Sequence, residues 1–531
     1  MMSNGGMHRN NLRVEKSEAV AARGMVASKH PLASEAGVEM LRLGGNAIDA
    51  AVATAFATGV VEPWMSGLGG VGLLVYYAAT EGRVRVFDFN GRSPLAATED
   101  MFPLGEGYEK ELFTWRAVEG KRNLMGYQSI IVPGVPAGLA LALKEAGSMD
   151  LRTVLQPAIR LAEEGFPLDW HTLLRVAADA PNIARFPDTA EVFFQNGFPR
   201  LVGMGPELPR LRQPDLARTL RTLAEEGVEA FYRGSIARQI VAAMAEHEGL
   251  ISAEDLATYE ALVVDIPVQQ AYGDATLIAT PPPSGGPAVA ATLAALDATF
   301  MAENGHNSLA ALTAFATASR AVFEERLTRG GAGGGGPMVN RGPADGSTTH
   351  LCAVDGQRNM VSLTQTLLSG FGSRVTIPGA GILMNNGMYW FDPEPGQANS
   401  VRGGVRPLAN MAPALLLRDG RPFATLGASG GRRIIGAMAQ IAVNLVSYGM
   451  GMQAAIAAPR IDVSTPQLIA DDRIPAATLA GLERLGMPLV TVEETFSPRQ
   501  FASPVGILVD DDAGVLRGGA DPFHAATCIG F

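Results

Sequence analysis

Residues 347–368 read STTHLCAVDGQRNMVSLTQTLL, and this stretch is the most informative part of the sequence. Polar and hydrophobic residues alternate with a period of two on both sides of a central turn, which predicts an antiparallel hairpin. A three-residue loop at the turn pairs Asp355 with Asn359. Continued outward, that register places Thr348 opposite Thr366. Opposed residues share one face of a sheet, so we expect the two hydroxyl groups to lie side by side.

A glycine-rich tract, residues 328–347, comes directly before Thr348. An amino-terminal threonine acts as both nucleophile and base, because its hydroxyl and its free α-amine belong to one residue. Such an amine has a reference pKa of about 7.7–8, so part of it is unprotonated near neutral pH. The amine becomes free only when the chain is cut, and a flexible tract before the threonine suits a self-cleaving precursor. The alternative is that Thr348 opens an ordinary strand after a linker. His350 and Cys352, further along the same face, are interpreted as packing residues.

Composition narrows the classes of protein that fit. The chain has 531 residues, of which 47% are hydrophobic and 18% charged, so it has enough apolar side chains for a large core, and global disorder is excluded. A formal charge of −11 argues against nucleic acid as the main partner. Two cysteines, Cys352 and Cys528, are too few for a disulfide framework or a cysteine-based zinc site.

Two features lead us to expect a cytoplasmic protein without a membrane span. No signal-peptide pattern is visible near the N-terminus. The longest uncharged run, between Arg433 and Arg460, carries polar residues and glycines that favour a buried helix.

Two glycine-containing segments match known sequence motifs. The segment Gly67-x-Gly69-x-x-Gly72 matches a dinucleotide-binding fingerprint, but it follows an expected helix and precedes an expected strand. A phosphate site needs the reverse order, so we interpret these glycines as a turn.

The second motif is Gly427-Ala428-Ser429-Gly430-Gly431, between an expected strand and an expected helix. This arrangement suits a nucleophile elbow, with Ser429 as the nucleophile of a serine hydrolase. His524 is the only later histidine, and Asp462, Asp471 and Asp472 are the candidate acids. The alternative is a glycine turn between strand and helix.

Several motifs occur together in a fixed order. In the C-terminal part they are Thr348-Thr349-His350, Thr364-x-Thr366, Gly381-Ile382-Leu383-Met384-Asn385-Asn386, Arg406-Pro407-Leu408, Gly430-Gly431 and Ala520-Asp521-Pro522. In the N-terminal part they include Gly44-Gly45-Asn46-Ala47, Val61-Glu62-Pro63 and Pro281-Pro282-Pro283-Ser284-Gly285-Gly286. From about Gly24 to the end, the chain resembles the γ-glutamyltranspeptidase family.

The resemblance implies an N-terminal-nucleophile hydrolase fold of the α+β class, a four-layer αββα sandwich with two central antiparallel sheets. It also implies self-cleavage between Ser347 and Thr348. We therefore expect a flexible N-terminus (1–23), a large subunit (24–347) and a small subunit (348–531), with a dimer of such heterodimers as one candidate assembly.

The resemblance assigns chemical roles as well. Thr348 would attack the amide carbonyl, Thr366 would position the Thr348 hydroxyl, and the backbone N–H groups of Gly430 and Gly431 would form the oxyanion hole. The substrate would be a small-molecule amide, and the acyl group would pass to water or to an amine. No metal and no organic cofactor is implied.

The predicted substrate pocket departs from the family pattern. Asn90 replaces the arginine that holds the glutamyl α-carboxylate, and Arg92 lies two residues further on. The residues that replace the family's paired serines and its ammonium-binding groups are Ala409, Asn410, Leu368, Gly387 and Trp390.

The sequence thus favours a γ-glutamyltransferase or glutathione hydrolase-like enzyme acting through an acyl-Thr348 intermediate. One alternative is an amidase or acylase of the same family whose substrate is not γ-glutamyl, such as a dicarboxylic monoamide, an oxamate-like amide, or a glutaryl or other acyl amide. A non-catalytic family member that binds ligand and stays uncut is a further alternative.

Overall fold

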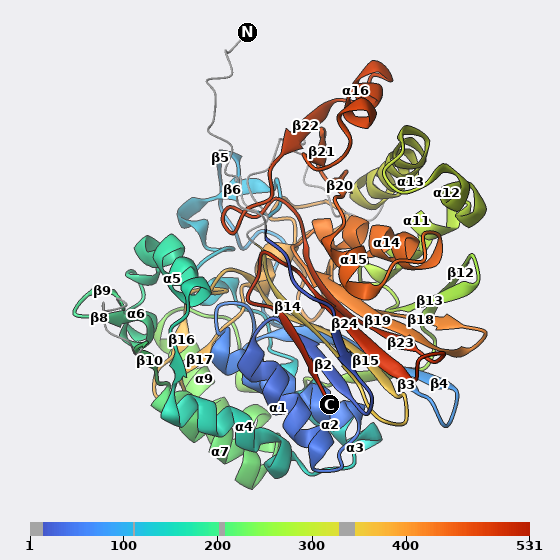
Figure 1. Cartoon of the computed structure of the whole chain (residues 1–531). Coiled ribbons are helices and arrows are strands. Elements are labelled where there is room, and N and C mark those ends of the chain that lie inside the picture. The colour runs from blue at the N-terminus through green and yellow to red at the C-terminus, as the bar shows by residue number, and fades with distance from the viewer. Residues whose placement is uncertain (1–13, 110–111, 201–207, 329–345) are drawn as a thin grey trace.

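The computed structural model describes residues 14–109, 112–200, 208–328 and 346–531. Two seven-stranded antiparallel sheets lie face to face at its centre (Figure 1). Sheet B consists, in spatial order, of β11 (Leu262–Val264), β4 (Arg83–Phe89), β3 (Val71–Ala78), β15 (Met360–Ser369), β14 (Gly346–Val354), β2 (Met25–Ser28) and β25 (Thr527–Gly530). Sheet A consists of β1 (Ala19–Ala21), β24 (Val515–Ala520), β23 (Ser503–Asp510), β19 (Arg421–Ser429), β18 (Ala414–Arg418), β13 (Ala275–Ala279) and β12 (Val268–Tyr272).

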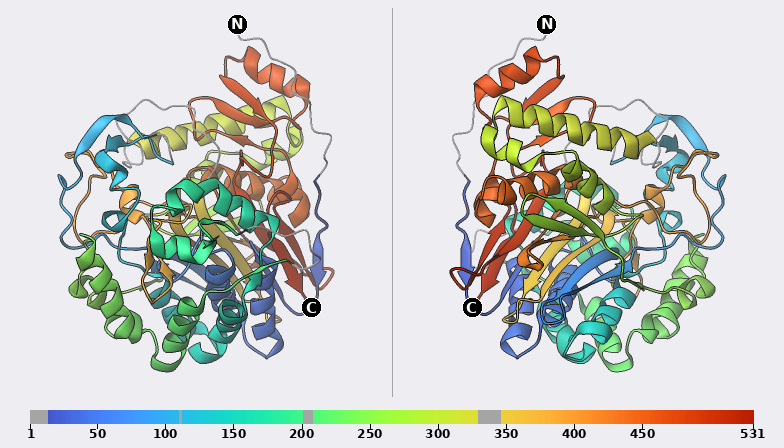
Figure 2. Two further views of the ribbon diagram at one scale, coloured as in Figure 1. Left: turned by 90° about the vertical axis from the view of Figure 1, so that its left-hand side faces the viewer. Right: turned by 90° about the vertical axis from the view of Figure 1, so that its right-hand side faces the viewer.

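Helices cover the outer face of each sheet (Figure 2). The helices that share the hydrophobic cluster on the outer side of sheet B come from the first half of the chain: α1 (Pro31–Arg42), α2 (Ala47–Val61), α3 (Val135–Ala146), α4 (Leu151–Glu164), α5 (Trp170–Ile183), α6 (Pro187–Phe193), α7 (Pro214–Glu226), α8 (Glu229–Tyr232), α9 (Ser235–Glu246) and α10 (Ala253–Ala257). Of these, α1, α2 and α3 contact the strands directly. Those that share the cluster on the outer side of sheet A are α11 (Gly286–Ala294), α12 (Ala298–Asn304), α13 (Leu309–Thr328), α14 (Arg433–Val446), α15 (Met452–Ala457) and α16 (Ala476–Arg484). Of these, α11, α14 and α15 contact the strands directly.

Short pairs of strands and single helical turns complete the described part. They are β5 (Leu104–Tyr108) with β6 (Arg116–Val118), β7 (Phe166–Pro167) with β10 (Arg210–Leu211), β8 (Phe194–Gln195) with β9 (Phe198–Pro199), β16 (Thr376–Ile377) with β17 (Ile382–Leu383), the trio β20 (Ile461–Asp462), β21 (Leu468–Asp471) and β22 (Leu489–Val492), and the 3-10 turns η1 (Glu119–Lys121), η2 (Tyr127–Ser129) and η3 (Gly387–Trp390).

Separate hydrophobic clusters fill the spaces between the layers. Along β3, Leu74 packs against the helices that cover sheet B, whereas its neighbour Val75 packs between the two sheets. Leu415 contributes to that middle cluster from sheet A, and Leu416, next to it, packs against the helices on the other side. Alternating side chains of a strand point to opposite faces, and β15 is buried along its whole length because a layer covers each of its faces. The four-layer αββα sandwich is confirmed.

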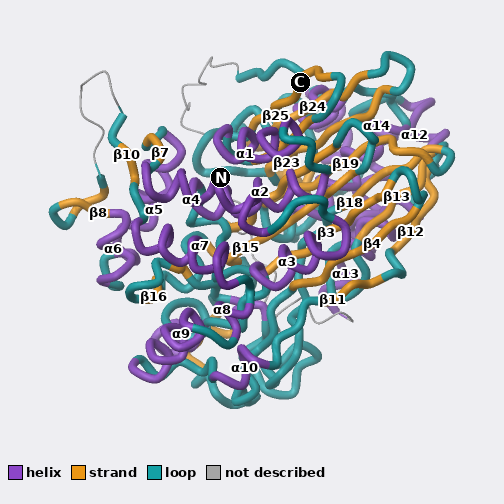
Figure 3. The backbone as a smooth tube through the Cα atoms, turned by 90° about the horizontal axis from the view of Figure 1, so that it is seen from below, coloured by secondary structure: helices purple, strands orange, loops and turns teal. Residues whose placement is uncertain are grey.

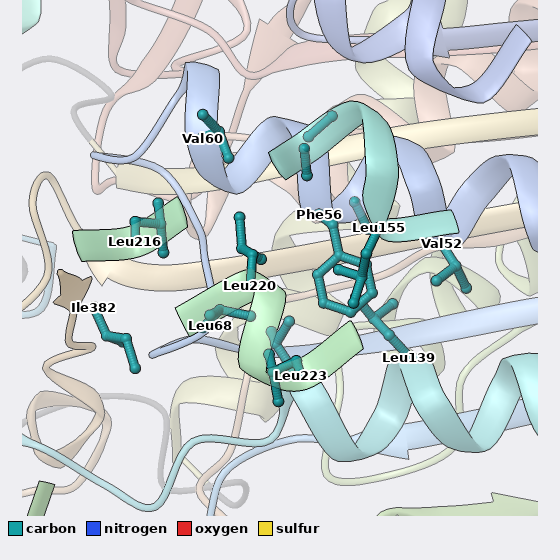
Figure 4. Packing of buried hydrophobic residues seen from close by; sticks show 14 of the residues in the cluster. Val52, Phe56, Val60, Leu68, Leu139, Leu155, Leu216, Leu220, Leu223 and Ile382 are labelled. Atoms are coloured by element: carbon teal, nitrogen blue, oxygen red, sulfur yellow. The ribbon is translucent and has the colours of Figure 1, made fainter. Parts of the chain in front are cut away.

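Helix α2 lies at the centre of the helical layer on sheet B. A capping box fixes its start: Asn46 Oδ1 accepts from the Asp49 N–H, and an Asp49 carboxylate oxygen accepts from the Asn46 N–H. Every residue of the helix is buried, and Figure 4 shows its side chains Val52, Phe56 and Val60 packed against residues of α3, α4 and α7. The view from below shows the same helices lying across the strands (Figure 3). The helix ends at Val61, so Glu62 is carried into the interior as its C-cap.

Part of the segment 1–23, which we expect to be a flexible N-terminus, contacts the rest of the fold. Residues 1–13 lie outside the described part, but β1 pairs with β24 at the edge of sheet A. Lys16 donates to the carbonyl oxygen of His524 at 2.7 Å and also to that of Ala526. Strand pairing and these hydrogen bonds connect this part of the segment to the fold. Most of the glycine-rich tract, residues 329–345, also lies outside the described residues.

In the part of the chain that the structure describes, no helix is both long enough and apolar enough to cross a membrane.

Candidate active site

The β14–β15 hairpin brings two threonine hydroxyls together. Followed outward from the turn, the strand pairing keeps the predicted register as far as Thr349. A β-bulge between Thr349 and Ser347 then shifts the register. Thr348, at the bulge, has its Oγ1 3.2 Å from Oγ1 of Thr366. Both side chains are buried. The predicted proximity of the two hydroxyls is confirmed, whereas the bulge was not predicted.

Both hydroxyls contact the carbonyl of Ser347. Thr348 Oγ1 lies 2.7 Å from that carbonyl oxygen, and the Thr366 hydroxyl donates to the same oxygen. A hydroxyl nucleophile therefore sits beside the carbonyl that precedes it in the chain, and a second hydroxyl polarises that carbonyl. Both hydroxyl groups thus lie next to the Ser347–Thr348 peptide bond, the bond that the sequence predicts to be cut.

The backbone of Leu368 fixes the orientation of Thr366. The Leu368 N–H donates to Thr366 Oγ1 at 2.8 Å, so the Thr366 proton is directed to a different acceptor. Leu368 has a φ of +83°, a left-handed conformation that side-chain-bearing residues rarely adopt. Strain of this kind persists where the surrounding structure enforces it, and here it accompanies the placement of one hydroxyl.

The glycine pair lies between β19 and α14. Gly430 has a φ of +134° and Gly431 a φ of +60°, so both adopt conformations that glycine alone takes readily. A Cβ at Gly430 would lie 2.8 Å from the Cα of Ala502. Helix α14 begins two residues after this turn, and its positive N-terminal end favours negative charge nearby.

A small pocket lies directly over the two threonines. Its described lining consists of Leu112, Phe113, Thr348, Thr366, Leu368, Trp390, Asn410, Met411, Gly431, Arg432 and Ile434. Of the residues predicted from sequence, the pocket thus brings together both threonines, Gly431, Leu368, Trp390 and Asn410.

The other predicted residues lie outside this pocket lining. Asn90 is buried and donates from Nδ2 to the carbonyl oxygen of Pro407. Arg92 points to α10, where it donates to Thr258 Oγ1 at 2.6 Å and to the carbonyl oxygen of Asp255. These hydrogen bonds thus hold the Arg92 side chain beside α10.

Gly387, Ala409 and Gly430 also lie outside the lining. The N–H of Gly387 donates to Asn385 Oδ1, and the N–H of Ala409 donates to the carbonyl oxygen of Pro283. Gly430 precedes the pocket residue Gly431 in the turn.

Arg432 is the charged residue of the described lining, and sequence reasoning missed it. Its guanidinium carbon lies 5.1 Å from the centre of the Phe113 ring, a cation–π contact, and the residue is 5% exposed. None of the described residues that line the pocket carries a carboxylate. The one feature of the sequence that could have indicated Arg432 is its position directly after the Gly430-Gly431 pair.

His350 and Cys352 are packing residues, as predicted. His350 Nδ1 lies 2.8 Å from Thr364 Oγ1, and burial holds the pKa of this imidazole well below its ordinary value. Burial raises the pKa of the Cys352 thiol to about 12, so it stays protonated and is not a nucleophile near neutral pH.

The serine-hydrolase alternative finds no support in the geometry. The expected strand–turn–helix is present, but the Ser429 hydroxyl donates to the carbonyl oxygen of Ser503. The ring nitrogens of His524 make no hydrogen bond with the described residues, Ser429 included. Asp462 and Asp471 are paired with Arg433 and Arg473.

Comparison with known families agrees with this geometry. The model of the family described as "Gamma-glutamyltranspeptidase" matches residues 33–331 and 336–531. The chain belongs to the γ-glutamyltranspeptidase family. The resemblance drawn from the sequence motifs is thereby confirmed.

Relatives of this γ-glutamyltranspeptidase-family chain carry two kinds of name. The Acylase ACY 1 proenzyme of Pseudomonas sp. (strain SE83) is 35% identical over 535 residues, covering 95% of this chain and 93% of the relative. The Glutathione hydrolase proenzyme of Bacillus subtilis (strain 168) is 31% identical over 563 residues, covering 97% and 92%. Among solved structures, the cephalosporin acylase from Bacillus halodurans superposes with a TM-score of 0.83 at 26% identity, covering 100% of this chain and 99% of that one.

Proposed function

We propose that this chain is a self-processing enzyme that hydrolyses or transfers the acyl group of an amide through an ester on Thr348. The observation that carries the proposal is the contact of Thr348 Oγ1 and the Thr366 hydroxyl with the Ser347 carbonyl. The family membership, and the names acylase and glutathione hydrolase among the relatives, support the same class of reaction.

Maturation would be an internal acyl transfer. Thr348 Oγ1 attacks the Ser347 carbonyl carbon, the C–N bond breaks, and the hydroxyl proton moves to the departing nitrogen. The product is an ester between Ser347 and the Thr348 side chain, with a free amine on Thr348. Water then hydrolyses that ester and leaves a carboxylate on Ser347.

The mature site would reuse the same groups on a substrate amide. The freed amine of Thr348 takes the proton from its own hydroxyl as Oγ1 attacks, and it then protonates the leaving amine. The N–H groups of Gly430 and Gly431, next to the positive end of α14, would stabilise the developing oxyanion. Water or a second amine resolves the acyl-threonine ester.

A denaturing gel tests the maturation step. We expect purified protein to separate into fragments of 347 and 184 residues, and N-terminal sequencing of the shorter one to read Thr-Thr-His. A chain that remains intact after long incubation while keeping full activity would overturn the proposal. A chain that remains intact and inactive but still binds ligand would favour the non-catalytic alternative.

The pocket favours an acyl group with one carboxylate and no ammonium. Leu368, Trp390 and Phe113 supply apolar walls, and Arg432 supplies the positive charge. Leu368, Gly387 and Trp390 replace the family's ammonium-binding groups, so a buried ammonium would lack those partners, which costs several kcal/mol. We therefore place the non-γ-glutamyl alternative first, with dicarboxylic monoamides such as glutaryl amides as the preferred substrates.

Replacing Arg432 tests this choice of substrate. For Arg432→Gln, we expect kcat/KM for glutaryl p-nitroanilide to fall by about 10- to 100-fold, the equivalent of one lost charged hydrogen bond. Valeryl p-nitroanilide has the same chain length without the carboxylate, so its kcat/KM should change little. Equal losses on both substrates, or stereospecific turnover confined to γ-glutamyl p-nitroanilide, would contradict the assignment.

A further inference from the structure

Three buried side chains with metal-binding atoms meet on the helical side of β14. Glu62 caps the end of α2, His171 lies in the first turn of α5, and His524 precedes β25. Glu62 Oε1 is 3.7 Å from His171 Nδ1 and 3.8 Å from His524 Nε2. One donor atom from each residue can be chosen so that all three lie within 4.8 Å of one another. The three residues are 0%, 2% and 4% exposed, respectively.

Several of these atoms have no hydrogen-bond partner among the described residues. They are Glu62 Oε1 and both ring nitrogens of His524. Buried polar atoms are paired in most proteins, and each exception needs an explanation such as a water or an ion. Two of these atoms, Glu62 Oε1 and His524 Nε2, lie 3.8 Å apart in the cluster, so one bound ion would pair both.

We propose that Glu62, His171 and His524 bind a divalent transition-metal ion, with zinc as the best match. Two imidazole nitrogens and one carboxylate oxygen form a donor set that zinc uses, with a fourth position left for water. Ligand atoms about 2.0–2.2 Å from a tetrahedral zinc ion lie roughly 3.3–3.6 Å from one another. The observed separations from Glu62 Oε1 come within a few tenths of an ångström of that range.

Two positively charged side chains near the cluster, Lys29 and Arg175, bear on whether a metal cation can bind there. Lys29 Nζ donates to the hydroxyl of Ser503 at 2.6 Å and to the carbonyl oxygen of the same residue. These bonds hold the Lys29 ammonium at the start of β23. Arg175 Nε donates to His171 Nε2 at 3.4 Å. A metal on Nδ1 requires the proton on Nε2, so His171 cannot then accept that bond. Arg175 is thus a competitor of the metal, both as a donor and as a like charge.

The ligands come from both sides of the Ser347–Thr348 bond. Glu62 and His171 belong to residues 24–347 and His524 to residues 348–531, so the metal would tie the two fragments together after cleavage. Thr349 Oγ1 donates to Glu62 Oε2 at 3.4 Å, which links the site to the residue next to the nucleophile. This role as a tie rests on the proposed cleavage, whereas metal binding itself does not.

Zinc titration of the full-length, chelator-treated protein tests the site. We expect wild type to bind one Zn²⁺ per chain and to show a higher melting temperature with the metal. His524→Gln should weaken binding at least a hundredfold, while Arg175→Gln should tighten it severalfold because the competing donor is gone. His306→Gln is the matched control, since His306 packs on Tyr448 away from the cluster and should leave binding unchanged.

Cobalt gives a second readout that does not depend on activity. Co²⁺ bound to wild type should show visible absorption that is lost in His524→Gln, with circular dichroism confirming that both are folded. Absence of stoichiometric Zn²⁺ in folded wild type, or wild-type affinity in His524→Gln, would overturn the site. The uncut Thr348→Ala chain should still bind the metal, so failure of the metal site and failure of the proposed cleavage give different results.

Discussion

Thr348→Ala is expected to yield one intact chain of 531 residues without amidase activity. The substitution removes the hydroxyl that lies 2.7 Å from the Ser347 carbonyl oxygen. Without it, neither the internal acyl transfer nor the attack on substrate takes place. Loss of a catalytic nucleophile typically costs on the order of 10⁶-fold in kcat. A denaturing gel and a p-nitroanilide assay on the same preparation measure both effects.

Two controls sharpen that experiment. Thr348→Ser keeps a hydroxyl and an amine on one residue, so cleavage and activity should persist at reduced rates. Ser429→Ala should cleave and turn over substrate at close to wild-type rates, because Ser429 is hydrogen-bonded to the Ser503 carbonyl. Cleavage or turnover by Thr348→Ala would refute the threonine mechanism, and an inactive Ser429→Ala would restore the serine-hydrolase alternative.

Thr366→Val should slow both maturation and turnover by about 10²- to 10³-fold, the usual effect of removing one aligned donor from a reacting oxygen. Valine has nearly the shape of threonine, so the buried site keeps its packing while the hydroxyl is lost. Maturation slows because the Ser347 carbonyl loses its polarising donor, and turnover slows because Thr348 loses a neighbour at 3.2 Å. The measurements are the rate at which the precursor band disappears and kcat for the fully cleaved enzyme.

The matched variant for this position is Thr366→Ser. It retains the hydroxyl, and the Leu368 N–H can still orient it, so both rates should stay within several-fold of wild type. If Thr366→Val matured and turned over at wild-type rates, Thr366 would be a packing residue and the positioning role would be wrong.

Local sequence rules determined which two hydroxyl groups meet in the hairpin, and the family resemblance assigned the nucleophile and the fold. Loop length fixes hairpin register, and the period of two fixes which side chains share a face. These rules placed Thr348 beside Thr366 with no knowledge of the rest of the chain. The four-layer sandwich followed from the resemblance that the ordered family motifs carry, because alternating polar and hydrophobic residues do not by themselves show that both faces of a strand are covered.

Only the tertiary structure decided the pocket and the buried cluster. Arg92 and Arg432 each follow a glycine, so the local sequence does not distinguish them. In the structure Arg92 donates to Thr258 beside α10, whereas Arg432 lies over the Phe113 ring in the pocket that contains Thr348. Glu62 and His524 are separated by more than four hundred residues, and no local periodicity relates them. Register and face are properties of neighbouring residues, whereas a pocket is built from segments whose proximity exists only after the layers have packed.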